Sequence, residues 1–267
     1  MLASDPRFLA VYRTSVELPK DAPWYQDELR LPANRIKSFL KRWPKFYNFL
    51  QWFLSPAYSL ATTTSTRKVL VRVFGDSPLG DKIILNLGSG TKRIHPEIIN
   101  VDIHPFKNVD VVADIKELPF EDGSCDLVVL DSVLEHIPDA AAVVSEITRI
   151  VKPSGYLFVT VPFLYPFHAS PNDYYRWTRA GIEESFKSFS RIEAGLRAGP
   201  MAALQGILMH IFGLLLCFGS ERLYILFTNI GMVVFSPLKL LDAVFRLVPQ
   251  SHEVAADIYF LGQKVSR

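Results

Sequence analysis

The segment from Lys82 to Asp102 constrains the fold of this chain more than any other feature. An apolar run ends in the turn sequence Gly88-Ser-Gly90, and a second run, Ile98-Ile-Asn-Val-Asp102, ends in an acid. This order is typical of a buried strand, a tight glycine turn and a second strand that ends in a carboxylate. Such a turn lets the backbone approach a nucleotide-like ligand closely, and the carboxylate suits the ribose hydroxyls of that ligand.

Three kinds of cofactor compete for this turn. A dinucleotide fingerprint needs a third glycine three residues after Gly90, and Arg93 in that position counts against NAD and FAD. A P-loop needs Gly-Lys-Ser/Thr after four spacer residues, which the stretch from Gly88 to Lys92 does not provide. S-adenosylmethionine carries no phosphate, and it needs the tight turn, an acid for its ribose and a slot for its adenine.

Strand and helix patterns alternate after the turn. We expect strands at 109–115, 189–197 and 257–265, and a helix at 140–151. The segments 118–131 and 152–162 each predict a turn followed by an apolar strand. This alternation predicts an α/β fold, a Rossmann-like, doubly wound and mostly parallel sheet of seven strands.

These motifs resemble the class I S-adenosylmethionine-dependent methyltransferases, in the branch whose first motif reads Leu-Asn-Leu-Gly-x-Gly and whose second strand ends in Asn-Val-Asp. The matching residues are 85–90 and 100–102, and the resemblance covers about residues 82–195 and the end of the chain. Many relatives carry an acid at the position of Asn86, whose amide still donates and accepts hydrogen bonds. The resemblance implies S-adenosylmethionine as the cofactor and says little about the methyl acceptor.

The resemblance also implies roles for the residues at the strand ends. The backbone of 88–90 would pass beneath the methionine and ribose, Asp102 would hold the ribose hydroxyls, and Asp114 with Ile115 would frame the adenine. Asp131 follows the fourth strand, at the edge where open α/β sheets bind ligands. The full predicted cofactor set is Asn86, Gly88, Ser89, Gly90, Asp102, Ile103, Asp114, Ile115, Asp131 and Ser132.

The segment 162–178, which follows the fifth strand, is dense in groups that could contact an acceptor. It carries the pattern His-x-x-Pro-x-Asp-Tyr-x-Arg, often seen in relatives at this place, and it ends at Thr178, an expected helix cap. We expect His168 to act as a general base toward a hydroxyl group, with Asp173 orienting the histidine or the substrate. The alternative is that both residues pin the loop. Arg176 is then in a structural ion pair. A separate alternative is that Arg176 holds an anionic group, such as a phosphate or a carboxylate.

Other titratable residues predict no further chemistry. His136 is expected to be packed or to line the pocket, and no metal-ligand spacing links His95 and His104, so no metal site is expected. Cys125 and Cys217 suggest neither a disulfide framework nor a metal site, which indicates a reducing compartment. A formal net charge of +2, without a basic nucleic-acid motif, argues against a nucleic-acid partner.

The segment between the expected sixth and seventh strands is strongly apolar. It contains the runs Gly206–Gly219 and Leu223–Phe235, each 13 or 14 residues long, and an amphipathic piece, Leu238–Val248, with Lys239, Asp242 and Arg246 on one side. A spanning helix needs roughly 18 to 20 residues, so neither run is a confident transmembrane segment. We expect this segment to make monotopic contact with a membrane, or to form a lid over a hydrophobic substrate tunnel. The alternative is a helical subdomain hidden within the fold or in a homodimer.

The N-terminal flank has a related composition. Residues 35–54 combine five basic residues and seven aromatics with no acid, which suits either a membrane interface or a cap helix over the cofactor. Pro44 would kink this helix or start a second one, and the N-terminus does not read as a signal peptide. The expected organisation is a helical extension at 1–80, a cofactor domain at 81–198, an insertion at 199–252 and a last strand at 253–267.

The resemblance and the apolar flanks together imply an S-adenosylmethionine-dependent methyltransferase. The expected reaction is O-methylation of a hydrophobic or membrane-borne acceptor, such as a glycolipid, a lipid-linked saccharide or an isoprenoid-like metabolite. The expected location is the cytoplasm or the cytoplasmic face of a membrane. Two alternatives stay open: a soluble small-molecule methyltransferase with a helical lid, and a non-catalytic binding module that keeps the fold.

Overall fold

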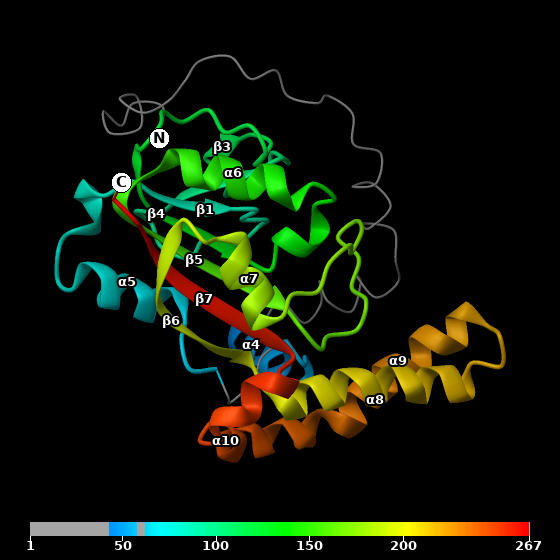
Figure 1. Cartoon of the computed structure of the whole chain (residues 1–267). Helices are drawn as coiled ribbons and strands as arrows, with labels where there is room; N and C mark the ends of the chain where they lie inside the picture. Colours follow the sequence, from blue (N-terminus) through cyan, green and yellow to red (C-terminus); the bar gives the residue numbers. More distant parts are fainter. Residues whose placement is uncertain (1–42, 58–61, 267) are drawn as a thin grey trace.

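The computed structural model describes residues 43–57 and 62–266, and its centre is one seven-stranded sheet (Figure 1). The strand order is β3-β2-β1-β4-β5-β7-β6. The strands are β1 (Ile84–Leu87), β2 (Ile99–Asp102), β3 (Val111–Val112), β4 (Cys125–Asp131), β5 (Val151–Pro162), β6 (Phe189–Ala198) and β7 (Asp257–Lys264). Strands β1 to β5 pair in parallel, whereas β7 runs antiparallel to both β5 and β6. The predicted Rossmann-like, mostly parallel sheet is confirmed.

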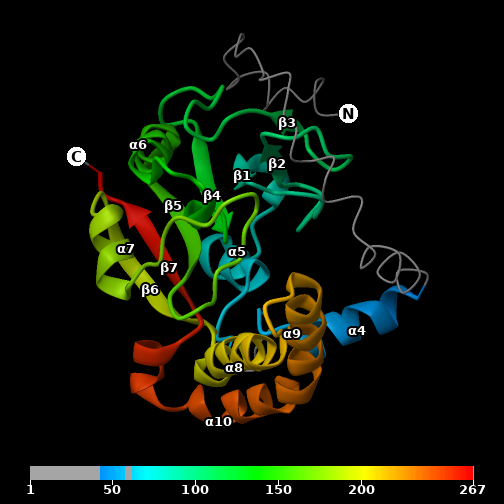
Figure 2. The same cartoon turned by 90° about the vertical axis from the view of Figure 1, so that its right-hand side faces the viewer.

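Helices cover both faces of the sheet (Figure 2). On one face, α6 (Ala140–Ile150) and α7 (Arg179–Ser185) pack on the larger apolar core, and on the other α5 (Thr66–Phe74) packs on a second cluster. The oxygen of Thr178 accepts a hydrogen bond from the backbone N–H of Gly181, so Thr178 caps α7 as predicted. Because both faces are covered, the central strands are apolar throughout, as in other parallel sheets.

The chain between β6 and β7 forms a helical hairpin that projects from the sheet (Figure 1). It consists of α8 (Pro200–Leu216), α9 (Glu221–Phe235), the 3-10 helix η4 (Ser236–Leu241), the one-turn helix α10 (Asp242–Phe245) and the 3-10 helix η5 (Pro249–Val254). The two long helices pack closely, since a Cβ atom on Gly231 would lie 3.0 Å from the Cα atom of Met209. The predicted helical insertion between the last two strands is therefore present.

The amphipathic piece of the insertion differs from the simple solvent-facing helix that its pattern suggests. Lys239 and Asp242 face inward and are 1% and 0% exposed, whereas Arg246, which the pattern placed on the same side, is exposed. The carboxylate of Asp242 accepts hydrogen bonds from the backbone N–H groups of Met201 (2.9 Å) and Ala202 (3.2 Å). The N-cap of α8 is Gly199, which has no side chain to cap these N–H groups, so a distant carboxylate supplies the acceptor.

Helix α4 (Pro44–Leu54) is the part of the basic and aromatic flank that the structure describes, and residues 35–42 lie outside the described residues. The helix begins at Pro44, in agreement with the expectation that this proline starts a helix. The ammonium group of Lys239 donates to the carbonyl of Trp52, and the amide of Gln205 donates to that of Leu54 (2.7 Å). These contacts fix α4 to the insertion.

Candidate active site

The glycine turn after β1 has a shape that requires its two glycines. Gly88 and Gly90 have φ angles of +66° and +56°, which L side chains rarely adopt. A Cβ atom on Gly88 would lie 2.6 Å from the side chain of Val133, whereas no described neighbour lies within 4 Å of a Cβ on Gly90. Between them, the buried hydroxyl of Ser89 has no hydrogen-bond partner among the described residues. We call the open space beside Gly90 the open cradle. Together with the unpartnered hydroxyl of Ser89, it suits a ligand that lies against this turn.

Asp102 joins this turn to the end of β2. One of its carboxylate oxygens accepts a hydrogen bond from the backbone N–H of Gly90 (2.8 Å), and the other accepts one from that of His104 (2.9 Å). Each carboxylate oxygen can accept more than one hydrogen bond, so the ribose role predicted for Asp102 remains sterically and chemically open. The neighbouring Ile103 is 39% exposed beside it.

Asn86 lies beneath the turn in a network of buried amides. Its side-chain N–H group donates to the side-chain oxygen of Asn100 (3.1 Å), whose own amide donates to the carbonyls of Lys92 and Asn108. A carboxylate at position 86 could not donate to Asn100, which gives a physical reason for the asparagine where many relatives have an acid. Its contact with a cofactor stays a prediction.

The remaining predicted cofactor residues lie at the same carboxyl edge of the sheet. Asp131 accepts a hydrogen bond from the hydroxyl of Thr160 (2.6 Å), and Ser132 has a φ of +56°, an unusual backbone for a residue other than glycine. Asp114 accepts a hydrogen bond from the N–H of the residue two places on. Ile115 is 6% exposed in the main core, and its adenine contact stays a prediction.

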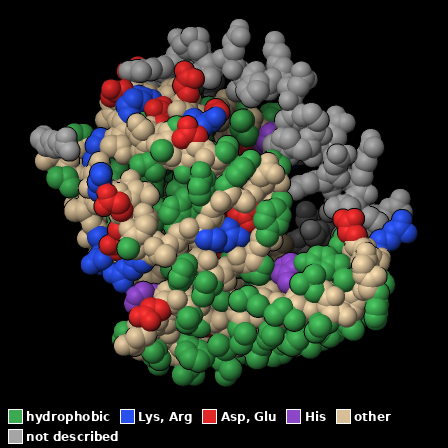
Figure 3. Space-filling model, turned by 45° about the vertical axis from the view of Figure 1, so that its right-hand side comes forward, with side chains coloured by type: hydrophobic (Ala, Val, Ile, Leu, Met, Phe, Trp, Pro, Cys, Tyr) green, Lys and Arg blue, Asp and Glu red, His purple; other side chains and the backbone are tan. Residues whose placement is uncertain are grey.

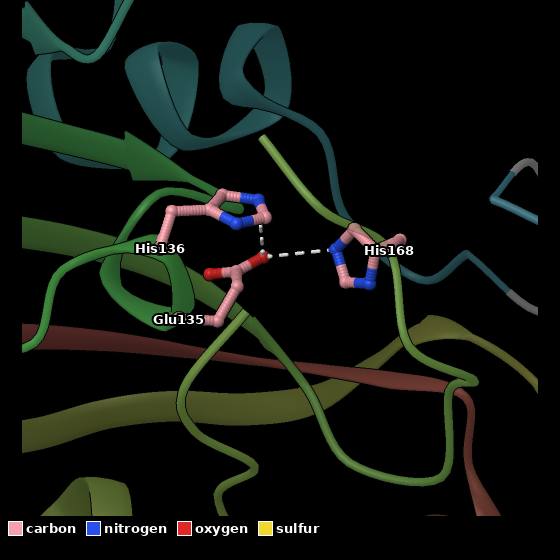
Figure 4. Close-up of side chains that lie close together, drawn as sticks. All are labelled: Glu135, His136 and His168. Atoms are coloured by element: carbon pink, nitrogen blue, oxygen red, sulfur yellow. Dashed lines mark ion pairs between the residues drawn. The ribbon is translucent and has the colours of Figure 1, made fainter. Parts of the chain in front are cut away.

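A buried carboxylate faces two imidazoles beyond the ends of β4 and β5 (Figure 4). Glu135 is 0% exposed, and its Oε1 atom lies 3.5 Å from Nε2 of His168 and 3.8 Å from Nε2 of His136. Neither carboxylate oxygen has a hydrogen-bond partner among the described residues. Burial of an unpaired carboxylate is costly, so these side chains are coupled through charge or through a shared proton.

The other nitrogen of each ring shows where the protons lie. Nδ1 of His136 is 2.6 Å from the carbonyl oxygen of Asn172, and Nδ1 of His168 is 3.2 Å from that of Pro166. Carbonyl oxygens only accept hydrogen bonds, so both Nδ1 atoms carry hydrogen and both Nε2 atoms are turned toward Glu135. If both rings were neutral, the Nε2 lone pairs of His136 and His168 would both face the Glu135 carboxylate and be repelled by it. A proton held between an Nε2 atom and the carboxylate removes that repulsion.

Electrostatics raise the pKa of His168 in this cluster and of Asp257 near it. Burial by itself would lower the pKa of His168, but Glu135, the Pro166 carbonyl and Asp173 outweigh burial and raise that pKa above its ordinary value. Burial, followed by repulsion from Glu135, raises the pKa of Asp257 at the start of β7 to about 7. A site with such groups can accept and release a proton at physiological pH.

Arg176 and Asp173 lock the loop that carries His168. The guanidinium binds the Asp173 carboxylate at two points, each 2.5 Å long, and its remaining N–H groups donate to the carbonyls of Tyr165, Pro166 and Tyr175. All five N–H groups of Arg176 are thus taken by protein acceptors, and none is left for a substrate anion. The geometry favours the loop-pinning alternative for Arg176, with Asp173 also receiving the backbone N–H of His168 (2.9 Å).

Comparison with known proteins finds a family match for the part of the chain that runs from the end of β1 into β5. Residues 87–159 match the family described as a methyltransferase domain. A probable S-adenosylmethionine-dependent methyltransferase of Mycobacterium tuberculosis is 41% identical over 58 residues, which cover 21% of each chain. The chain carries a class I S-adenosylmethionine-dependent methyltransferase domain. Its cofactor is S-adenosylmethionine, and the open cradle at Gly90 and the free hydroxyl of Ser89 fit a ligand of that kind.

The similarity of the mycobacterial sequences to this methyltransferase domain extends over short segments. A Mycolicibacterium smegmatis protein named as a probable S-adenosylmethionine-dependent methyltransferase is 43% identical over 58 residues, 21% of this chain and 23% of that one. The chain thus matches about a fifth of the length of these relatives. Among solved structures, Haemonchus contortus phosphoethanolamine N-methyltransferase 2 aligns with a TM-score of 0.47 and 20% identity, over 86% of this chain and 60% of that one. A likeness this distant indicates no substrate.

The methyltransferase domain contains two acids that the sequence patterns did not single out as site residues, Glu135 and Asp257. The signal for Glu135 is its place next to His136, directly after a strand whose end faces the ligand edge. Its oxygen and the two Nε2 atoms of His136 and His168 lie within 4.8 Å of one another, close enough to share one small cation. No spacing in the sequence pointed to such a set, because His168 comes from a different loop.

Proposed function

We propose that the chain is an S-adenosylmethionine-dependent methyltransferase that methylates an oxygen of a hydrophobic or membrane-borne acceptor. The observation that carries this proposal is the buried Glu135 beside His168, at the edge where the glycine turn, Asp102 and Asp131 also lie. Acid–base groups at the acceptor side are needed for a hydroxyl, which must lose its proton as the new bond forms.

S-adenosylmethionine supplies the methyl group as an electrophilic carbon on sulfur. The acceptor oxygen would bond to this carbon in place of the sulfur, and Nε2 of His168 would take the hydroxyl proton. Glu135 stabilises the imidazolium that results, while the Nδ1–H of His168 stays held by the carbonyl of Pro166. Asp173 and Arg176 act as positioning residues, because they hold the loop and make no free contact for a substrate.

The choice of a hydrophobic acceptor is supported by the neighbours of the loop that carries His168. Helix α8 packs on this loop, since a Cβ on Gly206 would lie 3.0 Å from Cδ of Pro166. Tyr165 packs on an alanine cluster that includes Ala202 and Ala203 of the same helix. An apolar helix beside the acceptor loop suits a substrate with an apolar portion.

The proposal is tested by binding and by turnover. Calorimetry should detect S-adenosylhomocysteine binding to the wild type, and Asp102→Ala should weaken it strongly. His168→Ala should then lower methyl transfer from labelled S-adenosylmethionine to extracted lipids by about 10²-fold or more while the binding stays. The control His252→Gln changes a histidine of η5 and should leave turnover unaltered. If the folded wild type does not bind S-adenosylhomocysteine, the proposal that the protein is an enzyme is overturned. Full activity of His168→Ala would show that His168 is not the base.

A further inference from the structure

The helical insertion exposes a continuous apolar surface. The most exposed large side chains on it are Leu214 (63%), Leu215 (71%), Phe218 (85%), Val234 (55%), Val244 (61%) and Leu247 (75%). Figure 3 shows hydrophobic side chains as an unbroken band across the lower part of that view. We call the exposed apolar side chains of α8, α9, η4 and α10, together with the residues Phe218, Leu247 and Val248, the apolar face. Soluble monomers rarely expose contiguous patches of this extent.

The polarity of residues 239–242 is the reverse of that of a water-soluble surface. Lys239 and Asp242 point inward and are almost fully buried, whereas Leu240 and Leu241 are 44% and 51% exposed. Lys239 donates to the backbone carbonyls of Trp52 in α4 and of Ser55 directly after it. Asp242 caps α8, so both charges have partners inside the protein. Water favours the opposite arrangement, with charges outside and leucines inside. An apolar surrounding favours the arrangement of these four residues, because it keeps the charges of Lys239 and Asp242 away from that medium, whereas Arg246, nearer the end of the segment, is exposed.

Helix α4 extends the apolar face with aromatic residues. Trp43, Phe46 and Phe49 are each 51–53% exposed, and Trp52 is 36% exposed. The basic Lys45 is exposed between them, and residues 43–57 contain no acid. Tryptophan with a nearby basic side chain is typical of the boundary between hydrocarbon and headgroups. Since α4 is bonded to the insertion through Lys239 and Gln205, the two elements present one surface.

The shape of the insertion favours lipid over a second protein copy. Exposed apolar side chains occur on α8, α9, α10 and α4, around a hairpin that protrudes from the domain (Figure 1). A fluid bilayer accommodates a convex apolar surface, whereas a protein partner needs a matching concave one to pack well. The aromatic and basic composition of α4 also suits headgroups better than a dry protein interface, whose core is depleted in charge.

The connections favour a hairpin that lies in the interface without crossing the bilayer. Within the described part of the chain, the helical stretch Glu221–Phe245 is long and apolar enough to cross a membrane by length and composition. However, charged residues Glu221 and Arg222 stand at its start, at the tip of the hairpin, and would have to pass through hydrocarbon. Both ends of the insertion also return to paired strands of the same sheet, β6 and β7.

We propose that the apolar face and helix α4 form a monotopic membrane-docking surface that seats the protein on a lipid bilayer. The inference deepens the proposed function, because it names the bilayer as the partner that presents the acceptor. It also places the loop that carries His168 next to the membrane, since α8 contacts that loop at Pro166. The binding itself requires neither the cofactor nor turnover.

The test is flotation of the full chain with phosphatidylcholine vesicles, alone and with added phosphatidylglycerol. We expect the wild type to float with both and more strongly with the anionic lipid, because Lys45 adds charge attraction to apolar burial. The variant Leu215→Glu/Phe218→Glu/Leu247→Glu should lose at least about tenfold in partitioning, since a charge in hydrocarbon is strongly unfavourable. The matched control Val71→Glu/Val265→Glu changes two exposed residues outside the face, 61% and 51% exposed, and should float like the wild type.

Folding and oligomeric state are checked on the same samples. Circular dichroism and S-adenosylhomocysteine binding should be the same for the triple variant and the wild type, because the changed side chains are exposed. The proposal is overturned if the wild type does not float, or if the triple variant floats equally well. A wild-type dimer in light scattering that the triple variant dissociates, without vesicle binding, would assign the face to a second copy instead. Failure of methyl transfer with intact flotation would overturn the proposed function alone.

Discussion

Oε1 of Glu135 lies 3.5 Å from Nε2 of His168, and the opposite ring nitrogen of His168 faces the carbonyl of Pro166. The two residues come from the turns after β4 and β5, which are neighbours in the sheet. The carboxylate therefore acts on the one ring nitrogen that the loop leaves free. This relationship determines the pH dependence expected of the reaction.

Replacing Glu135 with glutamine should shift the acid limb of the pH–rate profile. In the wild type the pKa of His168 is raised, so the neutral form needed for a base is lost as pH falls through a value above the ordinary 6.5. Without the carboxylate the imidazolium is less stable, and the limb should move to lower pH, with a lower rate at the plateau. Profiles of kcat/KM for Glu135→Gln and for the remote control Glu253→Gln measure this. An acid limb at the same pH in both variants would show that Glu135 does not tune the base.

Gly88→Ala should destabilise the domain more than Gly90→Ala. Both glycines have a positive φ, which costs an alanine about 1–2 kcal/mol, but only at position 88 would the new Cβ collide with Val133. Overpacking adds about 1–3 kcal/mol in a close-packed interior. Urea unfolding measures both losses. The double variant Gly88→Ala/Val133→Ala should recover part of the collision energy, and an equal loss for the two single variants would contradict the steric argument.

Arg176→Lys should loosen the loop that carries His168. Lysine cannot reproduce the two-point contact with Asp173 or the bonds to three carbonyls, so the segment 163–178 should become more sensitive to limited proteolysis. We expect turnover to fall while S-adenosylhomocysteine binding stays close to that of the wild type. Arg179→Lys, which changes an ion pair on α7, provides the control. Unchanged proteolysis together with unchanged turnover would show that Arg176 is dispensable for positioning.

The Arg176–Asp173 contact should also affect stability in acid. Burial opposes ionisation of Asp173, but the bonds from Arg176 outweigh it and lower the pKa of the carboxyl below its ordinary value. A lowered folded-state pKa contributes stability above the unfolded pKa of about 3.9, and this contribution disappears as pH falls through the folded value. Thermal unfolding from pH 7 to pH 2 should therefore show a smaller acid-induced loss for Asp173→Asn than for the wild type. Parallel curves would indicate that the pair is screened by water.

Asp242→Ala should destabilise the insertion by removing the acceptor at the start of α8. Loss of a helix cap costs about 0.5–2 kcal/mol, and here two backbone N–H groups lose their carboxylate. Asp139→Ala removes the N-cap of α6, where the side chain accepts one bond from Ala142, and serves as the comparison. Hydrogen exchange of α8 should rise in Asp242→Ala and stay unchanged in Asp139→Ala. Equal exchange of α8 in both would contradict the capping role.

The sequence alone determined the sheet and the position of the cofactor edge. Strand burial, the glycine turn at 88–90 and the acid at 102 are properties of short segments, because period, turn chemistry and chain order act locally. The predicted strand ends were close to those of β4 and β7, and Thr178 capped its helix as expected. The ligand edge followed because the carboxyl ends of parallel strands share one side of a sheet.

Only the tertiary structure decided the partners of the charged groups. Glu135 meets His168 because segments far apart in the chain converge beyond β4 and β5. The conformation of the loop 163–178 places all the acceptors of the Arg176 N–H groups within that loop. Likewise, the pattern of residues 238–248 specified two unlike sides without specifying which faces outward. The carboxylate of Asp242 turned inward because α8 begins without a capping side chain, and that left the leucines exposed. A periodicity defines a face, and only the neighbours available for packing and hydrogen bonding determine what that face meets.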